Sequence, residues 1–176
     1  MATRSRVPAP DAGSSNDPFA RSVLAHQPEL LRAFLRLYGT LWSHGVLDHE
    51  TKEVARLRNA RITGCNYCRN VRFAEARNRG LSEEKVTLID EHFAESALDD
   101  RLKAAIRYAD AFLVTPGPPS PALRDEMLRH FTPAEIVELT AGLALFMGFS
   151  KIAVVLGQEP ESMPTTVVPT PDRPSA

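Results

Sequence analysis

Residues 47–68 read LDHETKEVARLRNARITGCNYC, and this stretch decides the fold of the chain. Asp48 suits the N-cap position, so a helix is predicted from there to about Thr63. Apolar residues recur within it at helical spacing: Val54, Leu57 and Ala60. Gly64 breaks this helix and Cys65 opens the next one. The pattern therefore indicates two successive helices with the chain's most reactive side chains at their junction.

The two cysteines form a closely spaced pair. Cys65 and Cys68 are the only cysteines in the chain, and residues three apart on a helix are neighbours within disulfide range. A helix N-terminus and nearby arginines favour a thiolate over a thiol. Arg58 and Arg61 precede the pair, and Arg72 is expected one turn past Cys68 on the same face. This setting is typical of a redox couple.

Two other interpretations of the pair stay open. A zinc half-site would need a second pair of ligands, and only His44 or His49 could complete it nearby. Free cysteines are also often simple buried residues of an apolar core. The redox hypothesis is preferred, and no metal site is predicted.

Working outward, the rest of the chain between its two ends is expected to be helical. No strand-like alternation and no fixed-period repeat is visible. The predicted fold class is therefore all-α, a helical bundle. The expected helices cover residues 18–26, 29 to about 43, 48–63, 65–79, a segment capped by Ser82, 99–114, 122–130 and 133–156.

The two ends of the chain differ from its middle. Residues 1–17 are rich in Pro, Ala and Ser, and residues 158–176 contain five prolines. Neither has the apolar content that offsets the entropy of ordering. We expect a flexible N-terminal arm at 1–17, one helical domain at 18–157 and a disordered Pro-rich tail at 158–176.

Composition narrows the function classes. With 176 residues, 43% hydrophobic content and a net charge of −1, the chain suits one soluble domain and gives no electrostatic case for nucleic acid or anionic membranes. Residues 1–17 lack the apolar run of a secretory signal, so a cytoplasmic location is expected. There, catalytic or sensing cysteine pairs are commoner than structural disulfides. No nucleotide or flavin motif is present, so no cofactor is predicted.

The helix expected after Pro133 is apolar nearly all round. Between residues 139 and 156 its one charge is Lys151. A membrane span is the alternative, but Thr140 and Ser150 also interrupt the run and no basic loop flanks it. Such a helix is more often central to a bundle or buried between subunits. We therefore predict no membrane insertion and a homo-oligomer.

A family resemblance rests on the stretch quoted above. The pattern Leu-Asp-x3-Lys-Glu-Val-x2-Leu-Arg-x-Ala-x3-Gly-Cys-x-Tyr-Cys at residues 47–68 is similar to the carboxymuconolactone decarboxylase superfamily, and most to its alkylhydroperoxidase D-like, peroxidase-related branch. The likeness continues through residues 101–109 and 131–139 and covers residues 24–156. It implies an alkylhydroperoxidase D-like helical fold and assembly into dimers, trimers or hexamers.

The resemblance also implies a site. The branch signature is Glu-x11-Cys-x2-Cys-x3-His; Glu53, Cys65 and Cys68 match it, and Arg72 stands where the family has histidine. By resemblance, Cys68 is the peroxidatic thiol that attacks a hydroperoxide, Cys65 resolves it, Glu53 is the base, and an external dithiol restores the pair. From the residues alone, Glu53 is more typical of a salt-bridged helix face than of a base, and the family spacing reverses that preference.

The arginine changes what this site can do. Arg72 cannot pass protons, although it can hold a thiolate or orient a peroxide oxygen. The relay would then fall to another group such as His44 or His49, each of which is also typical of a plain surface histidine. The substitution supports an alternative, a non-catalytic redox sensor or scaffold. A lactone decarboxylase-type reaction is a second alternative, since that branch does not depend on a CxxC pair.

Overall fold

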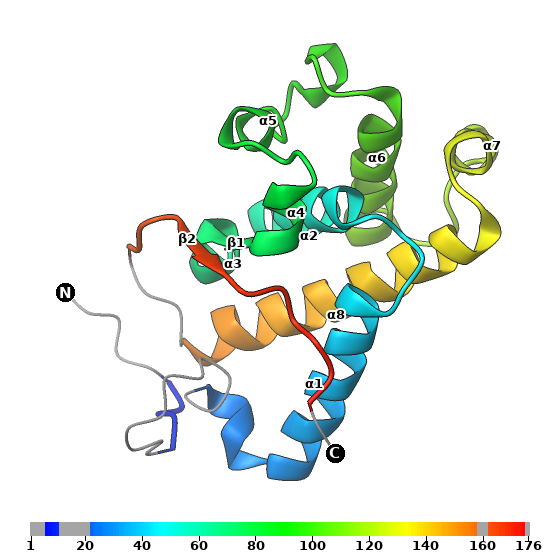
Figure 1. Cartoon of the computed structure of the whole chain (residues 1–176). Coiled ribbons are helices and arrows are strands. Elements are labelled where there is room, and N and C mark those ends of the chain that lie inside the picture. Colours follow the sequence, from blue (N-terminus) through cyan, green and yellow to red (C-terminus); the bar gives the residue numbers. More distant parts are fainter. Residues whose placement is uncertain (1–5, 11–21, 158–161, 175–176) are drawn as a thin grey trace.

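The computed structural model describes residues 6–10, 22–157 and 162–174, and it is mainly helical (Figure 1). The all-α prediction is confirmed. The eight α-helices are α1 (Pro28–Ser43), α2 (His49–Thr63), α3 (Asn66–Asn70), α4 (Ala74–Asn78), α5 (Glu83–Thr87), α6 (Asp100–Val114), α7 (Pro121–His130) and α8 (Pro133–Leu156). Two short 3-10 helices, η1 (Val23–His26) and η2 (Phe93–Glu95), and two strands, β1 (Val71–Phe73) and β2 (Thr166–Val168), complete the described elements.

Side-chain caps fix where the long helices start. Asp48 accepts from the Thr51 amide at the start of α2, and Asp99 plays the same part for α6. Thr132 and Glu135 form a full capping box at α8. These caps lie where the sequence predicts them, so the boundaries of α2, α6 and α8 agree with expectation within about two residues.

Helix α2 lies at the centre, packed against α6 and α8 (Figure 1). It is polar, yet it is buried along most of its length. Two ion pairs allow this, because buried charges need partners: Lys52 Nζ lies 2.7 Å from Glu138 on α8, and Arg58 Nε lies 2.6 Å from Asp110 on α6. The central helix is therefore fixed to both neighbours by charge as well as by its apolar residues.

Helix α8 is long and apolar enough to cross a membrane by length and composition alone. In the structure it crosses α2 instead and contacts α6 and α1. Its buried side chains include Leu139, Leu143 and Phe146, which pack into the apolar core. This packing agrees with the expected place of the helix inside a bundle.

The prediction of one continuous helix over residues 65–79 is wrong. The helix breaks at Val71, whose backbone is extended, and residues 71–73 form β1 between the short helices α3 and α4. The cause is tertiary: β1 pairs in parallel with β2, with Val71 opposite Thr166. A β-branched residue fits this extended conformation well.

The expectation of a disordered tail is also corrected. Residues 162–174 lie against the helices, and Thr166–Val168 supply β2. At the other end, Arg6 donates to the carbonyl oxygens of Val154 and Val155 near the end of α8. The remainder of the expected N-terminal arm, residues 1–5 and 11–17, lies outside the described residues, as do residues 158–161 and 175–176 of the tail.

Candidate functional site

The cysteine pair sits where α2 gives way to α3. Gly64 ends α2 in the left-handed conformation with φ of 72°, a conformation that suits glycine, and the chain turns directly into Cys65. Cys65 is the N-cap of α3, and its Sγ accepts from the Cys68 amide at 3.2 Å. The two cysteines form a disulfide with Cα atoms 5.3 Å apart. The pairing expected from their spacing is therefore present.

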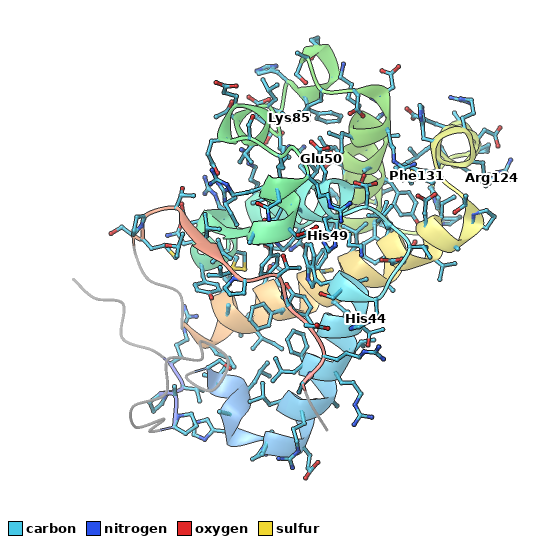
Figure 2. The ribbon with its side chains drawn as sticks, viewed as in Figure 1. His44, His49, Glu50, Lys85, Arg124 and Phe131 are labelled. Atoms are coloured by element: carbon cyan, nitrogen blue, oxygen red, sulfur yellow. A yellow bond between two sulfur atoms is a disulfide. The ribbon has the colours of Figure 1, made fainter. Side chains whose placement is uncertain are left out.

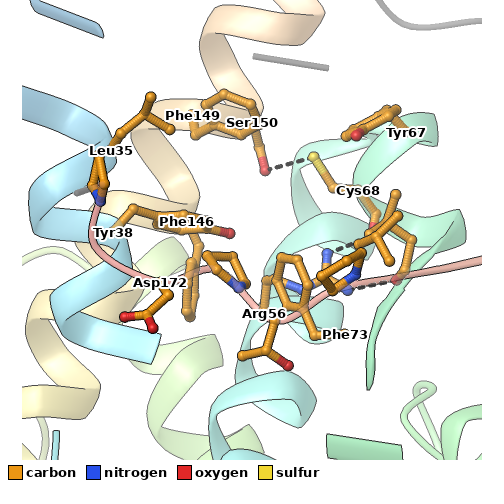
Figure 3. Close-up of a pocket in the computed structure, with 16 residues that line it drawn as sticks. Leu35, Tyr38, Arg56, Tyr67, Cys68, Phe73, Phe146, Phe149, Ser150 and Asp172 are labelled. Carbon is orange, nitrogen blue, oxygen red and sulfur yellow. Dashed lines mark hydrogen bonds between the residues drawn. The ribbon is translucent and has the colours of Figure 1, made fainter. Parts of the chain in front are cut away.

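The two sulfur-bearing residues differ in access. Cys65 is 0% exposed, and its neighbours are Ala60 and apolar side chains of α8. Cys68 is 6% exposed and lines a cavity of about 560 Å³ (Figure 3). A molecule in the cavity would therefore meet Cys68, while Cys65 lies behind it.

The cavity is mainly apolar. Its wall combines side chains from α1, α2, α8, the CxxC helix and the C-terminal segment. Figure 3 shows the aromatic side chains around this space, with Tyr67 and Cys68 on one side and Tyr38 and Phe146 on the other. Burial raises the pKa of Tyr38 to about 12, partly opposed by Arg56, so its hydroxyl stays protonated near neutral pH.

Ser150 brings a hydroxyl to the reactive sulfur. Its Oγ donates to Cys68 Sγ at 3.4 Å, and it accepts from Asn59 Nδ2 at 3.0 Å (Figure 3). Ser150 is 2% exposed and Asn59 is fully buried. Since the amide orients the serine oxygen, the hydroxyl proton is directed toward Cys68.

Glu53 is placed deeper than the base expected from the family resemblance. It is fully buried, does not line the cavity, and pairs with Arg56 through both carboxylate oxygens at 2.7 and 2.8 Å. Glu53 Oε1 also accepts from the Phe73 amide at 3.1 Å. The carboxylate thus holds an arginine and a backbone amide in place.

Arg56 is the arginine that reaches the cysteine segment. It lines the cavity and donates to the carbonyl oxygens of Cys68, at 2.6 Å, and Val71, at 2.7 Å. Burial alone would lower the pKa of its guanidinium, but the Glu53 charge more than offsets this, so the net direction is upward. A permanent cation therefore fixes the last turn of α3 and the start of β1.

The expected position of Arg72 beneath Cys68 is wrong, because the helix does not continue through it. Arg72 lies on β1, and its guanidinium makes two 3.1 Å hydrogen bonds to Glu83 on α5. It lines a separate cavity of about 260 Å³ rather than the one that contains Cys68. The residue at the family histidine position therefore braces α5 against the redox segment.

The two histidines considered as relays also lie elsewhere. Figure 2 shows His44 at the end of α1 and His49 at the start of α2. His44 Nε2 lies 2.6 Å from Asp172, and His49 stacks on Trp42 with ring centroids 6.4 Å apart. Neither lines the cavity beside Cys68. Among the described residues, no group of three His, Cys, Asp or Glu side chains could hold a metal ion.

Sequence reasoning missed three polar residues of this site: Arg56, Asn59 and Ser150. A signal existed for Ser150, since it places a hydroxyl inside a mainly apolar stretch of helix. Arg56 follows Glu53 by three positions, the spacing of a pair on one helix face. Nothing local singled out Asn59.

Comparison with known proteins agrees with the sequence resemblance. The family model for the carboxymuconolactone decarboxylase family matches residues 28–111. An uncharacterized protein of Mycobacterium tuberculosis is 36% identical over 113 residues, which are 64% of this chain and 39% of that protein. This chain thus spans about two fifths of the length of that curated relative.

Solved structures share the fold. A protein of unknown function from Agrobacterium tumefaciens superposes with a TM-score of 0.71 at 20% identity, over 91% of this chain and all of that one. An alkylhydroperoxidase AhpD core, described as an uncharacterized peroxidase-related protein from Ralstonia eutropha, gives 0.70 at 20% identity, over 90% and 93% of the two chains. At these identities the likeness establishes the fold alone.

Proposed function

We propose that the chain, whose residues 28–111 match the model of the carboxymuconolactone decarboxylase family, is a thiol-dependent peroxidase. The family match indicates a peroxidase-related or decarboxylase-type function. The redox-linked pair at Cys65 and Cys68 favours the first, with a hydroperoxide as substrate and an external dithiol as reductant. We place the reaction in the cytoplasm, where such dithiols are available.

The single observation that carries this proposal is the unequal burial of a bonded cysteine pair. Cys68 lines the cavity, whereas Cys65 is fully enclosed behind it. A peroxide can therefore approach Cys68 directly. Cys65 can react only with what forms on Cys68, which is the division of work between an attacking and a resolving thiol.

In the first step the Cys68 thiolate attacks the terminal oxygen of the hydroperoxide. An S–O bond forms, the O–O bond breaks, and the sulfur is oxidised to sulfenic acid while the alkoxide leaves. The Ser150 hydroxyl, which donates to Cys68 Sγ, stabilises the thiolate before attack. A proton from solvent in the cavity converts the alkoxide to an alcohol.

In the second step Cys65 displaces hydroxide from the Cys68 sulfenic acid. A disulfide forms, and the thiol proton of Cys65 leaves with the hydroxide as water. The pair is already within bonding distance, since the Cα atoms are 5.3 Å apart in the bridged form. An external dithiol then supplies two electrons and two protons by thiol–disulfide exchange and is itself oxidised to a disulfide.

Glu53 and Arg56 have a positioning role in this scheme. Both Glu53 oxygens accept hydrogen bonds from Arg56, so the carboxylate is directed at the guanidinium rather than at the cavity beside Cys68. Arg56 in turn holds the Cys68 carbonyl. We therefore assign to Glu53 the support of the redox segment rather than the proton transfer that the family resemblance implies.

A non-catalytic redox sensor is the second candidate. Arg72 and both candidate histidines lie away from the cavity, so no described side chain at an expected relay position reaches Cys68. In such a protein the cysteine pair would be oxidised once, and its disulfide would be reduced only slowly. A decarboxylase-type reaction would instead proceed independently of the cysteines.

Peroxide consumption with dithiothreitol separates these functions. The proposal expects repeated turnover in the natural chain and loss of it in Cys68→Ser. In Cys65→Ser without dithiothreitol, we expect one equivalent of peroxide to be consumed and a sulfenic acid to remain on Cys68, which a dimedone adduct reveals by mass. Consumption of a single equivalent by the natural chain under excess dithiothreitol would favour the sensor.

A further inference from the structure

Residues 162–174 form a segment that we call the C-terminal strap. Near its start Met163 packs against the aromatic core; the strap then pairs through β2 with β1 and ends beside α1. In Figure 1 it crosses the face of the molecule from β1 toward α1. It supplies six of the residues that line the cavity beside Cys68: Val168, Pro169, Thr170, Pro171, Asp172 and Pro174.

Three side-chain contacts hold the strap after β2. The Glu75 amide donates to Thr170 Oγ1 at 2.9 Å, Ser43 Oγ donates to the Pro171 carbonyl at 2.5 Å, and His44 Nε2 lies 2.6 Å from Asp172 Oδ1. The proline-rich sequence loses less entropy than other residues when it is ordered. The attachments are few, so this segment can open without unfolding the helices.

The last part of the strap lies directly on α1. Gly39 is buried in α1, and a Cβ atom at this position would overlap the backbone of Asp172 and Arg173. Backbone cannot rotate away as a side chain can. Any residue other than glycine at position 39 must therefore displace either a helix or the strap, and the strap has the weaker attachments.

We propose that the C-terminal strap is a gate that admits small molecules to Cys68 and excludes a macromolecular dithiol until it opens. The inference rests on the proposed role of the cysteine pair. A reductant reaches the disulfide through the cavity, because Cys65 is enclosed and Cys68 lines the cavity wall. The strap forms one wall of that cavity. A small dithiol enters beside it, whereas the active-site surface of a protein dithiol needs that wall removed.

The strap is also joined to the redox segment itself. Its strand β2 pairs with β1, which begins three residues after Cys68. Arg56 bonds the carbonyl groups of Cys68 and of Val71. The same arginine therefore fixes the reactive helix and the strand on which the strap is seated.

The test compares two helical glycines. Gly39→Ala and Gly39→Leu should displace the strap. The control is Gly148→Ala on α8, where a Cβ meets nothing within 4 Å in the same chain and alanine keeps the side chain small. Size exclusion verifies that this control keeps the mass of the natural chain. The full-length oxidised protein is reduced with excess dithiothreitol or with excess reduced thioredoxin. Free thiols are counted over time by alkylation and intact mass. This readout needs no peroxidase activity, so it can fail while the proposed function stands.

We expect thioredoxin to reduce the Gly39 variants about tenfold faster than the natural chain and the control. This is the rise that follows if the fraction of molecules with an open strap increases about tenfold. The dithiothreitol rate should change less than about twofold in all of them. Equal thioredoxin rates in the Gly39 variants and Gly148→Ala overturn the gate. If the Gly39 variants do not fold, Ser43→Ala with Thr170→Val removes two attachments instead and must meet the same criterion.

Discussion

Ser150 Oγ on α8 lies 3.4 Å from Cys68 Sγ on α3, and these residues are 82 positions apart in the chain. Asn59 of the central helix holds the serine oxygen from the other side. Side chains of α2 and α8 thus form a hydrogen-bonded chain that ends at the sulfur of Cys68 on α3. The arrangement gives Cys68 a hydrogen-bond donor from α8, while Arg72, at the family histidine position, lines a different cavity.

Replacing Ser150 should make the Cys68 thiol less acidic. In a Cys65→Ala background, which leaves one thiol, Ser150→Ala is expected to move the midpoint of the alkylation rate upward by about 1–2 pH units, because it removes a hydrogen bond to the charged form. Ser96→Ala is the control, a partly buried hydroxyl outside the cavity. An unchanged midpoint would remove Ser150 from the site.

Breaking the Glu53–Arg56 pair should destabilise the fold. Arg56→Ala leaves a fully buried carboxylate without its cation, and such losses cost about 3–5 kcal/mol. Arg124→Ala, which removes an exposed pair with Asp125, should cost at most about 1 kcal/mol. Urea unfolding measures both. If the two variants unfold at the same urea concentration, the pair does not support the redox segment.

Restoring the family histidine should not restore a relay. Arg72→His puts the imidazole on β1 near Glu83, beside the smaller cavity, so we expect none of the about 10²–10⁴-fold gain that a placed general acid–base can give. Stability should fall by about 1–2 kcal/mol with the lost contacts. Arg77→His is matched, since Arg77 also pairs with Glu83. A large rise in peroxide turnover in Arg72→His alone would show that position 72 reaches the reaction.

The difference between sequence expectation and structure at Arg72 has a plain cause. Helix starts such as Asp48 and Thr132 are set by hydrogen bonds within four residues, so local sequence predicts them. The break at Val71 is set by pairing with Thr166, 95 residues later. No periodicity near residue 71 carries that information, and the predicted helix therefore ran through it.

The same reasoning applies to the site. The cysteine pair is local and was predicted from two residues. Ser150 reaches Cys68 only because α8 crosses α2, and α2 is central only because Lys52 and Arg58 find acidic partners on other helices. A polar helix at the centre, beside an apolar helix that stays partly exposed, reverses the usual pattern.

Acid should weaken the cap of α2. Burial tends to raise the pKa of Asp48, but hydrogen bonds from Thr51 and Arg101 outweigh it and hold the pKa below the ordinary 3.8. A carboxyl group with a depressed folded-state pKa stabilises the protein above its unfolded pKa, and this contribution disappears as pH falls through the folded pKa. The stability difference between the natural chain and Asp48→Asn should thus be constant from neutral pH to about 5 and shrink below about 4. A difference that grows on acidification would contradict this assignment.

The last prediction concerns assembly. Helix α8 is apolar, yet much of it is not covered within one chain. Its exposed positions between Val137 and Val155 form a stripe that is small or apolar at Val137, Ala141, Ala144, Gly148 and Val155 and carries one charge, Lys151. Small side chains let a second helix approach closely, and a soluble monomer seldom exposes a continuous patch of this kind. We expect this stripe to pack against a second copy of the chain, in a closed dimer, trimer or hexamer.

Light scattering after size exclusion tests this with a matched pair of valines. Val137 on the stripe is 69% exposed, and Val114 at the end of α6 is 67% exposed. Within one chain, the same change to glutamate therefore removes a similarly small amount of packing at each position. Val137→Glu, or Ala144→Glu at the middle of the stripe, should dissociate the assembly toward the 19.4 kDa chain, because an unpaired carboxylate is costly to bury between helices. Val114→Glu should leave the mass unchanged. A natural chain that already runs as a 19.4 kDa monomer at micromolar concentration would refute the interface.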